Sequence, residues 1–152
     1  MKEPSQKQKL VNLTPPAAIV DDASLTVTEL DTEGFDRVQI VLIMGATDIA
    51  CTAAKLTESN AAGSGHADIT NSIYGTAADV AGDTSSLPAE DDDNGFFVWD
   101  VDLRYRKRYI DATITVGDGT AGGYYAVIAI LSRGDEAPVG VSERGCAGYI
   151  RC

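Results

Sequence analysis

The run from Ile110 to Val116 constrains the fold more than any other part of the chain, because apolar and polar residues alternate along it. Such an alternation is typical of a β-strand with one buried face, and here the other face carries Asp111 and two threonines. The residues Gly117–Thr120 supply turn chemistry, and a second apolar run spans Gly123–Leu131. We therefore expect a β-hairpin in the C-terminal third of the chain.

Five other segments have strand patterns, and the chain has no helical period. One of them, Phe96–Leu103, places Phe97, Trp99, Val101 and Leu103 on one side, as the aromatic centre of a core. Another is a dense apolar run whose second half looks buried on both faces. The five segments are Ser24–Thr28, Arg37–Met44, Ala50–Leu56, Ala67–Tyr74 and Phe96–Leu103. With turns between them, they predict an all-β fold, an antiparallel β-sandwich or jelly roll of about seven strands with extended N- and C-terminal tails.

The 152 residues are enough for one domain with its own core. Residues 1–16 are polar and lysine-bearing and end in two prolines, so we expect an extended N-terminal arm outside the core. Residues 17–138 form the β-sandwich domain, with a long surface loop over Gly75–Glu90. Residues 139–152, rich in glycine, serine and arginine, are expected to form a C-terminal tail that lies over the domain or a neighbour.

The net charge of −11 argues against a nucleic-acid partner, since phosphate binding needs a cationic surface. No segment has the apolar length of a membrane span or a secretion signal, so we expect synthesis in the cytoplasm and no membrane partner. Three cysteines are too few for a disulfide scaffold or a tetrahedral metal site. Cys51 fits a small buried hydrophobe, and Cys146 and Cys152 fit either a small disulfide loop or two free thiols.

No catalytic, cofactor or metal site is expected. The one histidine, His66, lies in a glycine-rich loop and fits a solvated residue better than a general base. The acidic run Glu90–Asp93 lacks the spacing of an EF-hand loop and fits a solvated turn. Asp100 and Asp102 share the outward face of one strand, so a glycosidase pair is the enzymatic alternative, but any half-exposed strand has the same pattern. The chain is therefore expected not to be an enzyme.

Four cations stand within five residues of an otherwise acidic chain, at Arg104, Arg106, Lys107 and Arg108. They must repel each other unless carboxylates lie near. They are therefore either a partner-contact site or an internal ion-pair network with Asp100, Asp102 or the run 90–93. The candidate partner-contact residues are these four together with the lysines of the N-terminal arm, Lys2, Lys7 and Lys9.

The order of the segments between Phe35 and Pro138 resembles small structural proteins encoded near the major capsid gene of tailed bacteriophages. In those proteins a strand ending in Leu-x-Glu-Ser is followed by a Lys-Arg-Tyr strand and then by an Ala-Val strand before a proline-bearing turn. The matching parts of this chain are the strand Arg37–Met44, Lys55–Asn60, the aromatic strand at Trp99, Arg106–Val116, Ala126–Leu131 and Ala137–Pro138. Asp111 stands where those proteins commonly carry a basic residue.

The resemblance implies a virion protein on the head surface, a capsid decoration or cement protein whose partner is the major capsid protein. It also implies a homo-oligomer, for example a trimer, in which the arm 1–16 and the tail 139–152 clamp neighbouring subunits. Deletion of the arm would then weaken association with capsids and leave the domain folded. The alternatives are a phage neck or tail component and a carbohydrate- or receptor-binding module that uses Tyr74, Tyr105, Tyr124 or Tyr125.

Overall fold

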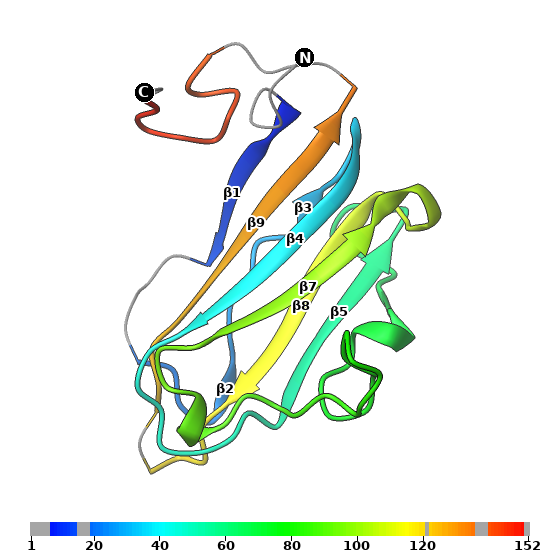
Figure 1. Cartoon of the computed structure of the whole chain (residues 1–152). Coiled ribbons are helices and arrows are strands. Elements are labelled where there is room, and N and C mark those ends of the chain that lie inside the picture. The colour runs from blue at the N-terminus through cyan, green and yellow to red at the C-terminus, as the bar shows by residue number, and fades with distance from the viewer. Residues whose placement is uncertain (1–6, 15–18, 121, 136–139, 151–152) are drawn as a thin grey trace.

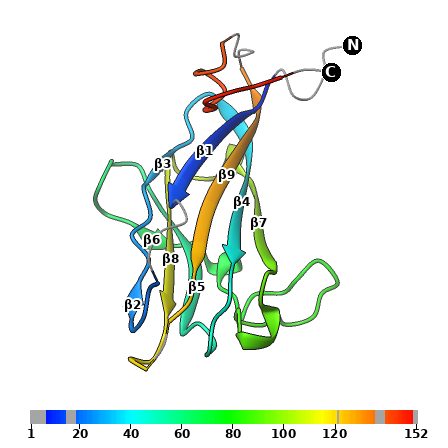
Figure 2. The ribbon, with the colours of Figure 1, turned by 90° about the vertical axis from the view of Figure 1, so that its left-hand side faces the viewer.

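The computed structural model describes residues 7–14, 19–120, 122–135 and 140–150, and over them the chain forms two antiparallel β-sheets without an α-helix (Figure 1). The first sheet has the strand order β1-β9-β4-β7, and the second has the order β2-β8-β5-β6, with β3 also paired to β8. The view from the side shows the two sheets as separate layers (Figure 2). The predicted antiparallel β-sandwich is thus confirmed. The strands are β1 (Lys9–Thr14), β2 (Ala23–Ser24), β3 (Leu30–Asp31), β4 (Phe35–Met44), β5 (Ala53–Ser59), β6 (Ala67–Asp68), β7 (Phe96–Asp102), β8 (Tyr109–Val116) and β9 (Tyr125–Gly134).

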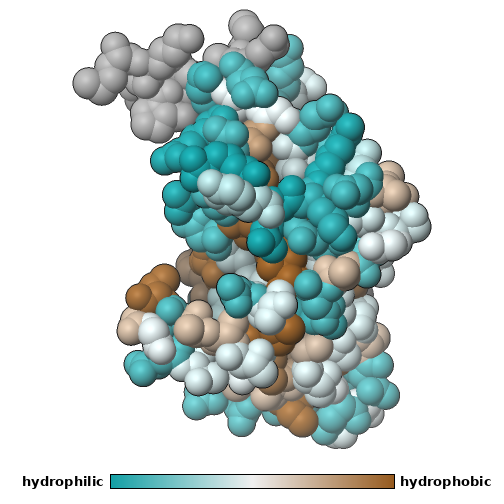
Figure 3. Space-filling model, turned by 90° about the vertical axis from the view of Figure 1, so that its right-hand side faces the viewer, coloured by the Kyte–Doolittle hydropathy of each residue, from teal (hydrophilic) through white to brown (hydrophobic). Residues whose placement is uncertain are grey.

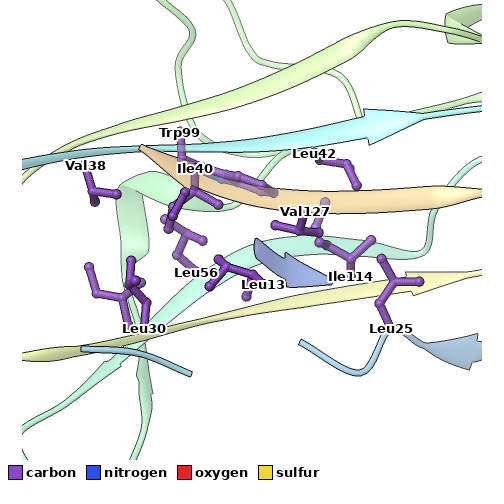
Figure 4. Close-up of a cluster of buried hydrophobic side chains, with 14 of the residues drawn as sticks. Leu13, Leu25, Leu30, Val38, Ile40, Leu42, Leu56, Trp99, Ile114 and Val127 are labelled. Carbon is purple, nitrogen blue, oxygen red and sulfur yellow. The ribbon is translucent and has the colours of Figure 1, made fainter. Parts of the chain in front are cut away.

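The core lies between the two sheets and is made of alternate residues of the strands (Figure 4). Val38, Ile40 and Leu42 of β4 are fully buried, and Leu56 and Ile114 of the other sheet are buried to the same extent. Each such side chain contributes about 1.5–3 kcal/mol by leaving water. The core therefore stabilises the packing of the two sheets against each other.

The strongest sequence patterns are confirmed. Alternation along β8 places Ile110 and Ile114 in the core. On β7, Trp99 is 5% exposed, and Phe97 and Val101 pack against the core from the same side. Three short 3₁₀-helices complete the described elements: η2 (Thr70–Ser72), η3 (Glu90–Asp92) and η4 (Leu103–Tyr105).

The predicted hairpin between 110–116 and 123–131 is wrong, because β8 belongs to one sheet and β9 to the other. The intervening segment crosses between the layers and is held by the residues near position 21. The Asp21 carboxylate accepts hydrogen bonds from the backbone amides of Asp118 (3.1 Å) and Gly119 (3.0 Å). Val20 forms a bridge with Gly123 farther along the segment. These remote contacts direct the chain away from the turn that would fold it back on β8.

The expectation that residues 1–16 lie outside the core is wrong for Lys9–Thr14, which form β1 at the edge of the first sheet. Leu13 is 2% exposed within the core, and Val11 packs against it. The apolar alternation that forms this strand is short and lies beside lysines, so the sequence pattern did not indicate it. A register shift between Asn12 and Thr14 ends the alternation. Deletion of residues 1–16 would therefore remove a core strand, contrary to our expectation that the domain survives it.

Three other strand predictions differ in their bounds. The expected strand 24–28 is replaced by two short strands, β2 and β3, which both pair with β8. The expected strand 50–56 is shifted to β5, and Cys51 is buried just before it. The expected strand 67–74 is only β6, followed by η2.

The segments outside the sheets lie over the domain. The described residues 75–89 form a loop without a strand or helix, as expected. Residues 140–150 also lack both, and the Leu10 amide donates a hydrogen bond to the Arg144 carbonyl at 2.9 Å. The C-terminal segment thus lies against the outer edge of β1. No helix in the described part of the chain is long and apolar enough to cross a membrane.

Candidate functional site

The expected cationic cluster lies between β7 and β8, and most of its charge is paired within the molecule. Arg104 contacts Asp102 through Nε (2.9 Å) and Nη2 (2.5 Å). Arg108 binds the Asp31 carboxylate through two nitrogens at 2.8 and 2.7 Å, and Glu33 at 2.6 Å. Arg104 thus forms the expected ion pair with Asp102, whereas Arg108 pairs with Asp31 and Glu33 and not with Asp100 or the run 90–93.

Glu58 connects the remaining two cations to β5. Its Oε1 lies 3.6 Å from Arg106 Nη1, and its Oε2 accepts a hydrogen bond from the Lys107 backbone amide at 3.1 Å. The Lys107 ammonium has no carboxylate within ion-pair distance among the described residues. Of the four cations of the cluster, Lys107 is thus the one without an ion pair within the described residues.

The lysines of the N-terminal arm are not brought to this cluster. Lys7 donates hydrogen bonds from Nζ to the carbonyls of Gly134 (2.7 Å) and Asp135 (3.3 Å), so it fastens the chain before β1 to the end of β9. Lys9 lies on β1 at the far edge of the same sheet. Lys2 lies outside the described residues.

The carboxylates of Asp100 and Asp102 do not form a suitable acid–base pair. Asp100 binds Arg37 through two hydrogen bonds (2.7 and 2.5 Å), which lower the pKa of its carboxyl. The bond from Arg104 lowers the pKa of Asp102 to about 2. A glycosidase needs one carboxyl with a raised pKa as its general acid, and both of these are shifted the other way.

The other candidates for chemistry have structural roles. The side chain of His66 is 19% exposed, and its Nε2 lies 2.9 Å from a Glu29 carboxylate oxygen. The expectation of a solvated histidine is therefore wrong. In the acidic run, Asp92 accepts a hydrogen bond from the Ala89 amide at the start of the same turn, and Asp93 accepts one from the Thr47 amide. Burial raises the pKa of the Cys51 thiol to about 11, which makes it a poor nucleophile. No cluster that could hold a metal ion occurs in the described part of the chain.

A groove of about 910 Å³ lies along β7, on the side away from β4 (Figure 3). Figure 3 shows apolar surface along the middle of this side, between polar flanks. The groove is lined by Val98, Trp99 and Val101 of β7, by Ile69 and by the loop that follows η2. Carboxylates lie around it, at Glu58, Asp68, Asp79, Asp100 and Asp102. Its size is within the range of sites that hold a ligand or peptide.

Tyr74 forms one wall of the groove and joins the loop to β7. Its ring meets Phe97 and Trp99 edge to face, with centroids 5.3 and 5.1 Å apart. Its hydroxyl donates to the Val98 carbonyl at 2.9 Å, and Trp99 Nε1 donates to the Ser72 carbonyl at 2.7 Å. Sequence reasoning placed Tyr74 in a strand and missed this wall, because no local pattern reports that this loop folds onto β7.

A second notable surface is the outer face of the first sheet, where apolar side chains of three adjacent strands lie together. On β4 and β7 the cross-strand pairs are Ile43 with Phe96 and Val41 with Val98. Phe96 is 68% exposed and Val98 is 43% exposed. We call this surface the outer patch; it consists of Val41, Ile43, Phe96, Val98, Ile128 and Ile130.

The outer patch explains why the second half of the run 37–44 looked buried on both faces. Val41 and Ile43 point away from the core and are only partly buried in the single chain. Contiguous exposed apolar surface of this kind marks interaction sites in soluble proteins. The sequence therefore carries a signal for this surface, although it was interpreted as burial within the domain.

Of the four tyrosines considered for sugar stacking, Tyr74 and Tyr105 line the groove, and Tyr124 and Tyr125 do not. Tyr125 is 5% exposed, and its hydroxyl bonds Thr47. Tyr124 is 51% exposed but does not line the groove. Tyr105 is 78% exposed beside the groove, with the Arg104 guanidinium 5.8 Å from its ring centroid.

Comparison with known proteins gives one structural likeness. No family model matches the chain, and no curated protein matches it. The crystal structure of SPBc2 prophage-derived protein YomS is similar over 82% of this chain and 92% of that chain, with 9% sequence identity and a TM-score of 0.49. We draw no conclusion on function from a likeness at this level.

Proposed function

We propose that the chain is a non-enzymatic structural protein of a bacteriophage virion, which decorates the assembled head by binding the major capsid protein. The observation that carries this proposal is the outer patch, an apolar surface of the kind that docks on another protein. Its centre contains no charged residue, and the Arg37–Asp100 pair lies at its border. Depletion of charge at the centre and polar groups at the rim are features of protein interfaces.

Two of the segments that carry the resemblance to phage head proteins support the proposal, because they pair in one sheet. Lys55–Asn60 includes the end of β5, and Arg106–Val116 contains β8, which pairs with it. Glu58 lies opposite Ile110 and also contacts Arg106. The two motifs therefore build one structural unit, as expected for residues that maintain a fold.

The pairing of charges supports a role without catalysis. In the groove, Asp100 and Asp102 are bound by arginines that keep them ionised, and Trp99 is fixed by its hydrogen bond to Ser72. A decoration protein needs only to bind the assembled shell in preference to its free subunits. Such selective binding stabilises the shell by mass action, by ~2.7 kcal/mol per site when the free concentration is a hundred times Kd.

The first test is the copy number of the protein in purified virus particles, measured by quantitative mass spectrometry against the major capsid protein. Hundreds of copies in simple proportion to capsid subunits would support decoration. A handful of copies would overturn it in favour of a neck or tail component. Complete absence would overturn it in favour of the carbohydrate- or receptor-binding alternative, for which exposed Tyr105 beside the groove is the relevant observation.

The second test addresses the outer patch with shells stripped of the protein. The double variant Ile43→Thr, Phe96→Ser removes one cross-strand pair of the patch and is expected to weaken shell binding at least about tenfold. The matched control is Val80→Ser, since Val80 is fully exposed and lies in the groove loop away from the patch. Equal affinities of the two proteins for shells would contradict docking through this face.

A further inference from the structure

The outward edge of β7 has backbone groups that the rest of the described chain leaves unpaired. β7 ends the first sheet, and only β4 pairs with it. The Gly95 carbonyl accepts from the Met44 amide, whereas the Val98 carbonyl accepts from the Tyr74 hydroxyl on the opposite side. Antiparallel pairing directs both backbone groups of one residue to the same side. The even-numbered residues of β7 therefore present their backbone groups to the groove.

At the middle of this edge, the Val98 amide, the Asp100 amide and the Asp100 carbonyl have no hydrogen-bond partner within the described residues. They belong to alternate residues of one strand edge, which is the spacing at which a neighbouring strand forms its hydrogen bonds. An open edge of this kind is the usual acceptor site for an added extended peptide.

The groove supplies space and side-chain contacts for such a peptide. Side chains that pointed toward the interior would meet Ile69, Val101 and Ala77, which are apolar. Side chains that pointed outward would lie beside Asp100 and Asp102, which bind Arg37 and Arg104 but whose side chains are still 38% and 46% exposed. The edge therefore fits an extended segment that alternates apolar and cationic residues.

The net charge of the molecule favours a cationic partner segment at the β7 edge over the same edge of a second copy. Two copies would each bring a net charge of −11 and their own Asp100 and Asp102 to the contact. A cationic segment would instead be attracted by the field of the whole chain.

We propose that the β7 edge is a β-augmentation site, which takes an extended segment of a partner protein with cationic residues at alternate positions. The new strand forms hydrogen bonds with Val98 and Asp100 and fills the groove beside Trp99. This inference does not rest on head decoration, and the probe used to test it contains no capsid protein.

The test uses the full chain and two ten-residue peptides, one alternating lysine with valine and one alternating glutamate with valine. Hydrogen exchange followed by NMR is expected to show new protection of the Val98 and Asp100 amides with the lysine peptide and none with the glutamate peptide. This measurement needs no variant. Protection confined to other residues, or no binding of the lysine peptide at millimolar concentration, would overturn the proposal.

A variant separates backbone pairing from attraction by charge alone. Val98→Pro removes the outward amide without touching the bonds to β4, a position where edge strands tolerate proline. It is expected to weaken binding about tenfold, the effect of one net hydrogen bond. Val98→Thr, which keeps the amide and the β-branched shape, should bind within about twofold of the natural chain. Equal affinities of the two variants would show that the peptide does not pair with this edge.

Discussion

At the scale of single residues, Trp99 joins the core to the groove. It is the only tryptophan of the chain, and its indole is buried while its Nε1 bonds the Ser72 carbonyl at 2.7 Å. Trp99→Phe leaves that buried carbonyl unpaired and is expected to lower the free energy of unfolding by about 1–3 kcal/mol. Urea unfolding followed by far-UV circular dichroism measures the change. Tyr74→Phe is the control, because water can replace its exposed bond to Val98, and an equal loss in both variants would refute the argument.

The acidic residues that bind arginines are expected to contribute to the response of stability to low pH. Hydrogen bonds from Arg108 and Arg104 lower the pKa of Asp31 and Asp102, the latter to about 2. In the folded chain the pKa of these carboxyls is lower than their pKa of about 3.9 in the unfolded chain. The stabilisation from their ion pairs is therefore present above about pH 3.9 and is lost as the pH falls toward about 2.

We therefore expect the free energy of unfolding to be constant between pH 7 and about pH 5 and to fall below about pH 4. Asp102→Asn should reduce that fall, because the variant has no carboxyl to protonate at this position. Asp91→Asn should leave the fall unchanged, since Asp91 forms no ion pair with another described residue. Urea titrations at a series of pH values test this, and identical slopes for the two variants would contradict it.

At the scale of strands, the sequence predicted those strands whose apolar and polar residues alternate locally. β8, β4 and β7 were found because each buries one face in the core. The partner of β8 could not be found in this way, because the loop after it is directed by Asp21, almost a hundred residues earlier. The groove was missed for the same reason, since its wall depends on Tyr74 reaching β7.

The contact between the C-terminal segment and β1 depends on a glycine. Gly145 has a φ of +72°, and a Cβ there would lie 1.7 Å from the Leu10 carbonyl oxygen. Gly145→Ala is therefore expected to detach this segment and to speed hydrogen exchange of the Leu10 amide, which bonds Arg144. Gly148→Ala is the matched control, because no atom lies within 4 Å of its Cβ position. Unchanged exchange of Leu10 in Gly145→Ala would show that the contact does not hold the segment.

At the scale of the whole molecule, net charge and the outer patch oppose each other. A charge of −11 drives copies of the chain apart, whereas the exposed side chains of Phe96 and Val98 favour contact between apolar faces. The range of charge repulsion falls from ~30 Å at 0.01 M ionic strength to ~3 Å at 1 M. Salt should therefore determine which of the two effects controls association.

We expect sedimentation velocity to show weak association at about 0.01 M salt and stronger association between copies at about 1 M. The double variant Ile43→Thr, Phe96→Ser should remain less associated at high salt, because it removes a cross-strand apolar pair from the patch. Val80→Ser should behave as the natural chain does, since Val80 lies outside the patch. If added salt dissociated the copies instead, ion pairs would control the contact, and Lys107 would be the first cation to substitute.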